Sequence, residues 1–118
     1  MAVRRVMPVF QADDPGAARG FYADVLGLEV AMDMDWITIY ADPANPGEQI
    51  GVMREDATAP VPPDTSIEVD DVDAAYAAAQ RMGCEIVHPL SDEAWGVRRF
   101  FVRDPNGKVL NVLSHRQK

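Results

Sequence analysis

Few side chains of this 118-residue chain have the types and spacing that catalysis requires. No serine stands in a local nucleophile motif, and neither does Cys84, the single cysteine. One cysteine forms no internal disulfide, and its expected role is that of a small buried apolar residue. The histidines, His88 and His115, are not an i, i+4 metal pair, and we expect His88 at the surface or in a loop. Glu68 could act as a general acid or base if desolvation raised its pKa, but the commoner case for such a residue is a half-exposed strand glutamate.

The last predicted hairpin of the chain indicates ligand binding more strongly than any residue indicates catalysis. The sequence of residues 104–107, Asp-Pro-Asn-Gly, predicts a three-residue hairpin loop. In the resulting register Phe101 faces Asn111 and Arg99 faces Leu113. The alternate positions form an apolar face that should pack on helices: Phe100, Val102, Leu110 and Val112. The first face carries charged, aromatic and amide groups that a core does not need, so it is the predicted ligand surface.

The same alternation extends this surface to other strands. In residues 36–41 we assign Ile37 and Ile39 to the helix side, because aliphatic side chains suit a core. The predicted ligand-binding residues are Trp36, Thr38, Tyr40, Gln49, Met53, Ser66, Glu68, Trp95, Arg99, Phe101 and Asn111. Met7 and Val9 are expected on the same surface.

Trp95 lies beside Gly96 on the loop that enters the Arg99 strand. Its indole could stack on a planar heterocycle and donate a hydrogen bond, or simply cover apolar surface. Arg98 should lie on the opposite face from Arg99 and pair with Asp92 or Glu93.

The elements that position these residues occur as an internal repeat. Asp13-Asp14 recurs as Asp70-Asp71, and Gly-Leu-Glu-Val at 27–30 recurs as Gly-Cys-Glu-Ile at 83–86. We therefore predict one domain of two modules, residues 1–56 and 63–118. A Pro-rich stretch, Arg54 to Asp64, should be an extended linker.

Each module is predicted to be βαβββ. The expected helices run from Pro15 to Leu26 and from Val72 to Met82, each after an aspartate cap and before a glycine. Their inward faces should comprise Ala18, Phe21, Tyr22 and Val25 in the first, and Val72, Ala75, Ala79 and Met82 in the second. The expected strands are 3–11, 28–32, 36–41, 49–53, 65–69, 85–88, 97–103 and 109–114.

Composition narrows the class of protein. With 47% hydrophobic and 25% charged residues, the chain has globular composition. A net charge of −8 disfavours nucleic acid and anionic membranes as partners. No apolar run is long enough to span a bilayer, and the N-terminus has no signal-peptide core, so we expect a cytoplasmic protein.

Three segments carry a family resemblance: FYADVLGLEV at 21–30, IEVDDVDAAY at 67–76 and FFVRDPNGKVLNVLS at 100–114. Together with the paired modules, they resemble the vicinal oxygen chelate superfamily of glyoxalase I, fosfomycin-resistance proteins, extradiol dioxygenases and bleomycin-resistance proteins. The resemblance implies an α+β fold whose βαβββ modules form curved, cleft-enclosing mixed sheets with helices outside. It also implies completion of the cleft in a homodimer.

Enzymes of that superfamily hold a divalent metal at positions that fall here on Met7, Asp64 and Asn111. A thioether and a neutral amide are poor ligands for a hard cation, so the resemblance predicts a degenerate metal site and no cofactor. Pro8 in the opening strand fits either exchange of this strand between protomers or an ordinary sheet edge.

Two classes of function, and a third possibility, follow from the resemblance. The first is a metal-independent binding protein, closest to the bleomycin-resistance proteins, that sequesters an aromatic or cationic antibiotic-like small molecule in a dimer cleft. The second is a metal-dependent lyase, isomerase or dioxygenase with displaced ligands, namely Asp64, Glu68 and His115. The third is an accessory subunit with a vestigial cleft.

Overall fold

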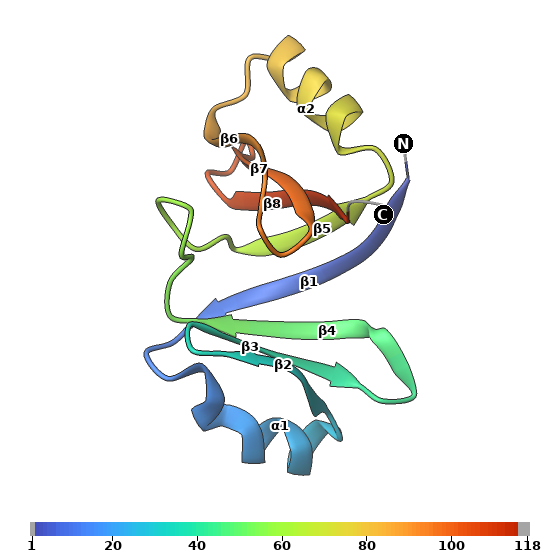
Figure 1. Ribbon diagram of the computed structural model, residues 1–118, viewed down its shortest axis with the longest axis vertical. Coiled ribbons are helices and arrows are strands. Elements are labelled where there is room, and N and C mark those ends of the chain that lie inside the picture. Colours follow the sequence, from blue (N-terminus) through green and yellow to red (C-terminus); the bar gives the residue numbers. More distant parts are fainter. Residues whose placement is uncertain (1, 116–118) are drawn as a thin grey trace. The chain divides into compact units, whose positions relative to one another are not determined.

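The computed structural model describes residues 2–115, which form an α+β fold of two compact units (Figure 1). Residues 7–62 form the N-terminal unit, and residues 63–115 form the C-terminal unit together with residues 2–6. Each unit contains the βαβββ succession predicted from the repeat.

The N-terminal unit contains the first set of elements. They are β1 (Val3–Gln11, shared with the other unit), the 3-10 turn η1 (Pro15–Ala18), α1 (Arg19–Leu26), β2 (Glu29–Met34), β3 (Ile37–Asp42) and β4 (Asn45–Met53). The strand order is β2-β3-β4-β1, antiparallel except for the parallel pair of β4 and β1.

The C-terminal unit repeats this plan. Its elements are β5 (Thr65–Val69), α2 (Val72–Arg81), β6 (Ile86–Asp92), β7 (Val97–Arg103) and β8 (Val109–His115). The order β6-β7-β8-β5, with β8 and β5 parallel, has the topology of the first unit. The shared topology supports the interpretation of the sequence as two copies of one unit.

The closing hairpin has the register predicted from its turn. Phe101 pairs with Asn111 and Arg99 with Leu113. Gly107 has a φ of 85°, and the amide of Asp104 donates to the carbonyl of Lys108 at 2.8 Å. A glycine suits this position because a positive φ strains a residue with a Cβ.

The helix ends follow the predicted signals in part. Asp71 caps α2 by accepting from the amide of Ala74 at 3.0 Å, and Gly27 ends α1 in the left-handed conformation, with a φ of 69°. Asp14, by contrast, makes no side-chain capping bond, since the chain enters α1 through η1. The first helix is therefore α-helical only from Arg19.

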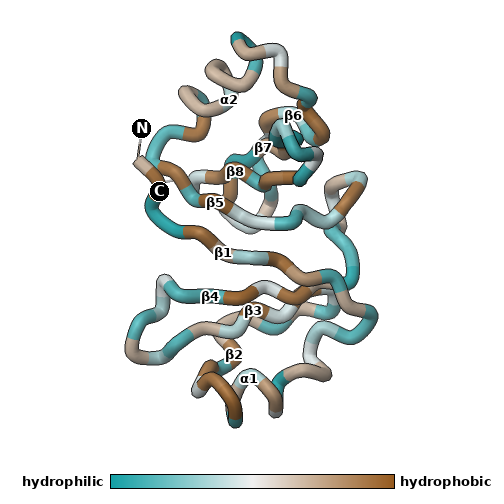
Figure 2. Tube along the Cα trace, turned by 180° about the vertical axis from the view of Figure 1, so that it is seen from behind, coloured by the Kyte–Doolittle hydropathy of each residue, from teal (hydrophilic) through white to brown (hydrophobic). Residues whose placement is uncertain are grey.

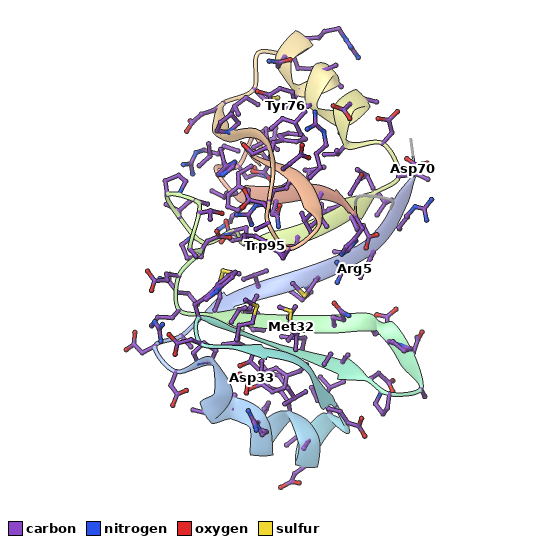
Figure 3. The ribbon with its side chains drawn as sticks, viewed as in Figure 1. Arg5, Met32, Asp33, Asp70, Tyr76 and Trp95 are labelled. Carbon is purple, nitrogen blue, oxygen red and sulfur yellow. The ribbon has the colours of Figure 1, made fainter. Side chains whose placement is uncertain are left out.

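The core of the C-terminal unit lies between the sheet and α2. Phe100 and Val112 pack with Val69 and Val72, as the predicted apolar face requires. The ring of Tyr76, which α2 presents to this core, meets Phe100 edge to face at 4.9 Å between centroids (Figure 3). One expectation was wrong: Met82 is exposed because α2 ends before it.

The predicted inward face of α1 is largely wrong. Phe21 and Val25 are exposed, whereas Tyr22 reaches the sheet, where its ring lies 4.7 Å from that of Tyr40. Figure 2 shows apolar colour along this helix. The reason is length: a helix of eight residues has about two turns, so few of its side chains can meet a sheet.

Hydrogen bonds and an ion pair join the first residues of β1 to the C-terminal unit. The amide of Ala2 donates to Asp70 Oδ1 at 2.8 Å, and the amide of Asp70 donates to the carbonyl of Ala2 at 3.0 Å. Arg5 pairs with Glu68 at 3.0 Å (Figure 3). Residues 54–64, the predicted linker, contain no helix or strand.

Candidate ligand-binding site

The polar face of the C-terminal sheet gathers five predicted ligand residues. We use "polar sheet face" for the side of β5–β8 opposite the Phe100 core; it carries Ser66, Glu68, Arg99, Phe101 and Asn111. Ser66 pairs with Asn111, which pairs with Phe101, so the three form one row across β5, β8 and β7. The strand alternation expected from sequence therefore holds here.

Arg99 lies between two aromatic rings on this face. Its guanidinium carbon is 4.8 Å from the ring centroid of Phe101 and 5.2 Å from that of Trp95. Trp95, on the loop between β6 and β7, is 43% exposed and is the solvent-facing member of the stack. A guanidinium between rings gains from cation–π attraction and preserves a flat surface. The arrangement presents an indole face to a planar ligand.

Two buried polar neighbours were missed by sequence reasoning. His88 is buried, with its ring 5.4 Å from that of Phe101, so the prediction that it lies at the surface or in a loop was wrong. Glu93 is also buried, 3.8 Å from His88 Nε2 and 3.7 Å from Arg99 Nε. The cause is that β6 continues through Pro89 to Asp92, with shifts in its register. The apolar Leu90 beyond Pro89 was a signal that the strand continues.

Arg98 takes the opposite face, as expected. It pairs with Asp92 at 3.2 Å, one of its two predicted partners, and with Asp73 at 2.9 Å. These pairs lie at the surface, where ion pairs contribute little stability.

Glu68 bridges the first and last strands of the C-terminal unit. Its carboxylate lies 3.0 Å from Arg5 Nε and 3.1 Å from His115 Nδ1. Desolvation alone would raise the pKa of Glu68, but the hydrogen bonds and positive charges of His115 and Arg5 lower it below its ordinary 4.5. The alternative of a raised pKa is therefore wrong, and Glu68 is the partly exposed strand glutamate that the sequence favoured.

Replacing Glu68 with Gln should remove one source of acid instability. A carboxylate with a depressed folded pKa stabilises the protein above its unfolded pKa, and that stability is lost as the pH falls through the folded value. We expect Glu68→Gln to be less stable than wild type at pH 7 and to show a smaller loss of stability below pH 4.5, the ordinary value for Glu. Urea titrations across the acid range measure both. If the two proteins lost stability equally as the pH fell, Glu68 would not have the lowered pKa described here.

In the N-terminal unit, the expected faces of β3 are reversed. Thr38 and Tyr40 point to the helix side rather than to the ligand surface. The Tyr40 hydroxyl donates to the carbonyl of Pro15 at 2.7 Å, and burial raises the pKa of Tyr40. Thr38 donates to Asp33 at 3.2 Å. The prediction assumed that a helix selects aliphatic partners, whereas η1 and Tyr22 offer a hydrogen-bond acceptor and an aromatic ring.

The aliphatic side of β3 instead joins an apolar cluster rich in methionine. Ile37 packs with Met7, Val9 and Met53, and Trp36 and Ile39 lie against them. Met32, labelled in Figure 3, and Met34 lie on β2 and pair with Ile39 and Ile37. Trp36 and Met53 thus share a surface as predicted, and Gln49 shares their side of the sheet while donating to the carbonyl of Pro46 at 3.0 Å. Methionine gives such a surface an adaptable shape.

Near Thr38 there is an open depression of about 550 Å³ at the start of η1 and α1. Its charged lining includes Arg19 and Asp33, which pair with each other at 2.9 Å. Because Arg19 and Asp33 neutralise each other, the depression offers a polar ligand little net charge.

The residues at the superfamily's metal positions do not fit a metal. Met7 packs among apolar side chains, and a Cβ on Gly51 would lie 2.9 Å from its Cε. Asp64 Oδ2 accepts from the amide of Val109 at 2.8 Å, and Asn111 donates to Ser66 Oγ at 3.1 Å. Across residues 2–115, no group of three or more His, Cys, Asp or Glu side chains is placed to hold a metal ion.

Comparison with known proteins identifies the family. The sequence model of the Glyoxalase/Bleomycin resistance protein/Dioxygenase superfamily matches residues 4–112. No curated protein matches the chain significantly in sequence. In the part of the chain that the structure describes, no helix has the length and apolar character needed to cross a membrane.

Solved structures share the fold at low identity. A superfamily member from Vibrio splendidus 12B01 is 19% identical, with a TM-score of 0.70 over 96% of this chain and 99% of its own. A hypothetical protein from Bacillus halodurans C-125 is 12% identical, with a TM-score of 0.77 over 100% and 98%. A variant of Streptomyces coelicolor methylmalonyl-CoA epimerase, in complex with 2-nitronate-propionyl-CoA, is 15% identical, with a TM-score of 0.71 over 98% and 100%. Because the family model covers most of its length, this chain belongs to the Glyoxalase/Bleomycin resistance protein/Dioxygenase superfamily.

Proposed function

We propose that the protein is a metal-independent small-molecule binding protein that sequesters an aromatic or cationic antibiotic-like ligand. In this proposal it acts in the cytoplasm as a homodimer and performs no chemistry. Its effect is mass action: bound ligand is removed from the free pool in proportion to affinity and protein concentration.

The observation that carries the proposal is the stack of Trp95 on Arg99 and of Arg99 on Phe101. An exposed indole backed by a guanidinium offers a rigid, flat surface for a planar ring. Aromatic pairs of this kind contribute about 0.5–1.5 kcal/mol beyond area burial. The buried carboxylate of Glu93, which lies beside Arg99 and His88, can interact with a polar or cationic substituent.

The donor set at the metal positions supports binding without catalysis. Met7 is a soft thioether, and Asp64 is already bonded to the backbone of β8. The rival proposal, a metal-dependent lyase, isomerase or dioxygenase, has one observation in its favour, the 3.1 Å contact between Glu68 and His115. Asp64, the third displaced ligand it needs, is instead bonded to Val109.

Replacing Trp95 with Ala should weaken ligand binding by about tenfold, because stacking area and its electrostatic complement are lost. Isothermal titration calorimetry of bleomycin and a panel of planar antibiotics measures the change. A second variant, Trp36→Phe, leaves Trp95 as the sole tryptophan of a chain that has two, so that its fluorescence reports on Trp95 alone. Ligand should quench the fluorescence of this variant.

Two outcomes would overturn the proposal. The first is the absence of any binding tighter than millimolar across the panel. The second is a stoichiometric divalent metal in protein purified without chelator, which would favour the enzyme instead. Size-exclusion chromatography with light scattering tests the homodimer separately.

A further inference from the structure

We propose that Asn111 is a specificity-determining residue that selects a ligand ring carrying an N–H donor on its edge. The inference rests on the proposed function and names the chemistry of the ligand. The site is the row of side chains that crosses the polar sheet face from β6 to β5: His88, Phe101, Asn111 and Ser66.

The Asn111 amide is buried and only half satisfied. The side chain is 7% exposed, and its Nδ2 donates to Ser66 Oγ at 3.1 Å. Its Oδ1 is inaccessible to solvent and has no hydrogen-bond partner within residues 2–115. A buried carbonyl oxygen without a donor is costly, by more than a typical hydrogen bond contributes. The oxygen therefore identifies a position at which a donor is missing.

In the amide orientation of the structure, Nδ2 contacts Ser66, and Oδ1 is the atom left to meet the ligand. Because Nδ2 is engaged with Ser66, the amide presents an acceptor and not a donor. A ligand carbonyl or carboxylate would face lone pairs and be disfavoured, whereas an N–H would satisfy Oδ1. Selection of this kind is strong because the wrong ligand leaves a buried polar atom unpaired.

The neighbouring residue on β7 explains why the donor should sit on a planar ring. Phe101, directly paired with Asn111, is completely buried and presents its ring beneath the guanidinium of Arg99. In this proposal the ligand ring takes the place of the Arg99 guanidinium against Phe101, so Arg99 and Trp95 must leave the stacked arrangement for the ring to reach Oδ1. Trp95 is on a loop that ends at Gly96, whose φ is 91°. The ligand class is therefore a planar heteroaromatic ring with an N–H on its edge.

A pair of probes of equal size isolates the hydrogen bond. Benzimidazole carries a ring N–H, and benzoxazole has an oxygen at that position. We expect wild-type protein to bind benzimidazole about tenfold more tightly than benzoxazole, the ratio that one hydrogen bond of ordinary net strength supplies. Titration followed by 1H–15N NMR measures both dissociation constants.

Two variants test whether the preference for benzimidazole over benzoxazole depends on Asn111. Asn111→Leu keeps the shape but removes the acceptor, so the preference for benzimidazole should disappear. Asn111→Asp retains an acceptor and should keep the preference. If Asn111→Leu does not fold, NMR spectra of the wild-type protein test the role of Asn111 instead. The Asn111 side-chain NH2 resonances should shift with benzimidazole and not with benzoxazole, since polarisation of Oδ1 changes the whole amide.

The outcomes separate this inference from the proposed function. Equal binding of both probes, with Asn111 resonances unaffected, overturns the role of Asn111 and leaves an aromatic binding protein. Retention of the preference in folded Asn111→Leu overturns it as well. Failure of both probes and of the whole antibiotic panel to bind overturns the two proposals together.

Discussion

Phe100→Ala is expected to lower the free energy of unfolding by about 3–5 kcal/mol, the cost of deleting a fully buried aromatic side chain. Phe100 is 1% exposed and packs against Val69, Val72 and Val112. Its edge-to-face contact with Tyr76 joins α2 to the sheet at 4.9 Å. The substitution removes this contact and opens a cavity that a close-packed sheet and helix cannot fill.

Urea denaturation followed by circular dichroism measures this loss. The matched control is Phe21→Ala on α1, since Phe21 is 58% exposed and its removal should change stability by no more than about 0.5 kcal/mol. Similar losses in the two variants would show that the burial of Phe100 does not organise the C-terminal unit.

The second large effect is expected at Glu93. Glu93→Ala should destabilise the protein by about 3 kcal/mol, because it removes a buried carboxylate that compensates the charge of the buried Arg99 guanidinium. Glu93 is 6% exposed and faces Arg99 and His88. The loss should also disturb ligand binding, since Arg99 loses an interaction that orients it between Phe101 and Trp95.

The preceding residue provides the control. Asp92 pairs with Arg98 at the surface, with its side chain 47% exposed, so Asp92→Ala should cost about 0.5 kcal/mol or less. The two variants remove adjacent carboxylates of similar local sequence, and thermal unfolding compares them directly. Equal shifts in melting temperature would mean that the cluster around Glu93 contributes no more than a surface pair.

The polar sheet face shows why part of the candidate site could be predicted from sequence. The Asp-Pro-Asn-Gly turn sets the pairing of β7 with β8, and strand alternation then assigns each side chain to one side. Both signals are local. The placement of Arg99, Phe101 and Asn111 together therefore required no knowledge of the rest of the fold.

His88 and Tyr40 show where local rules fail. The sequence around His88 contains Pro89, which indicates a strand end, but irregular pairing with β7 carries β6 past it. Tyr40 alternates correctly along β3, but the choice of side depends on α1 and η1, which offer Tyr22 and the carbonyl of Pro15. Alternation divides residues into two sets without stating which set meets the helix.

The amino-acid sequence alone determined the βαβββ repeat, the order of the strands and helices, and the register of the closing hairpin, because turn, cap and period-2 signals act between residues close in the chain. Tertiary structure alone decided which side of β3 meets a helix, that Glu93 is buried beside His88 and Arg99, and that Asn111 Oδ1 lacks a donor. The physical reason is that burial and hydrogen-bond satisfaction depend on every group packed around an atom, most of which are distant in sequence.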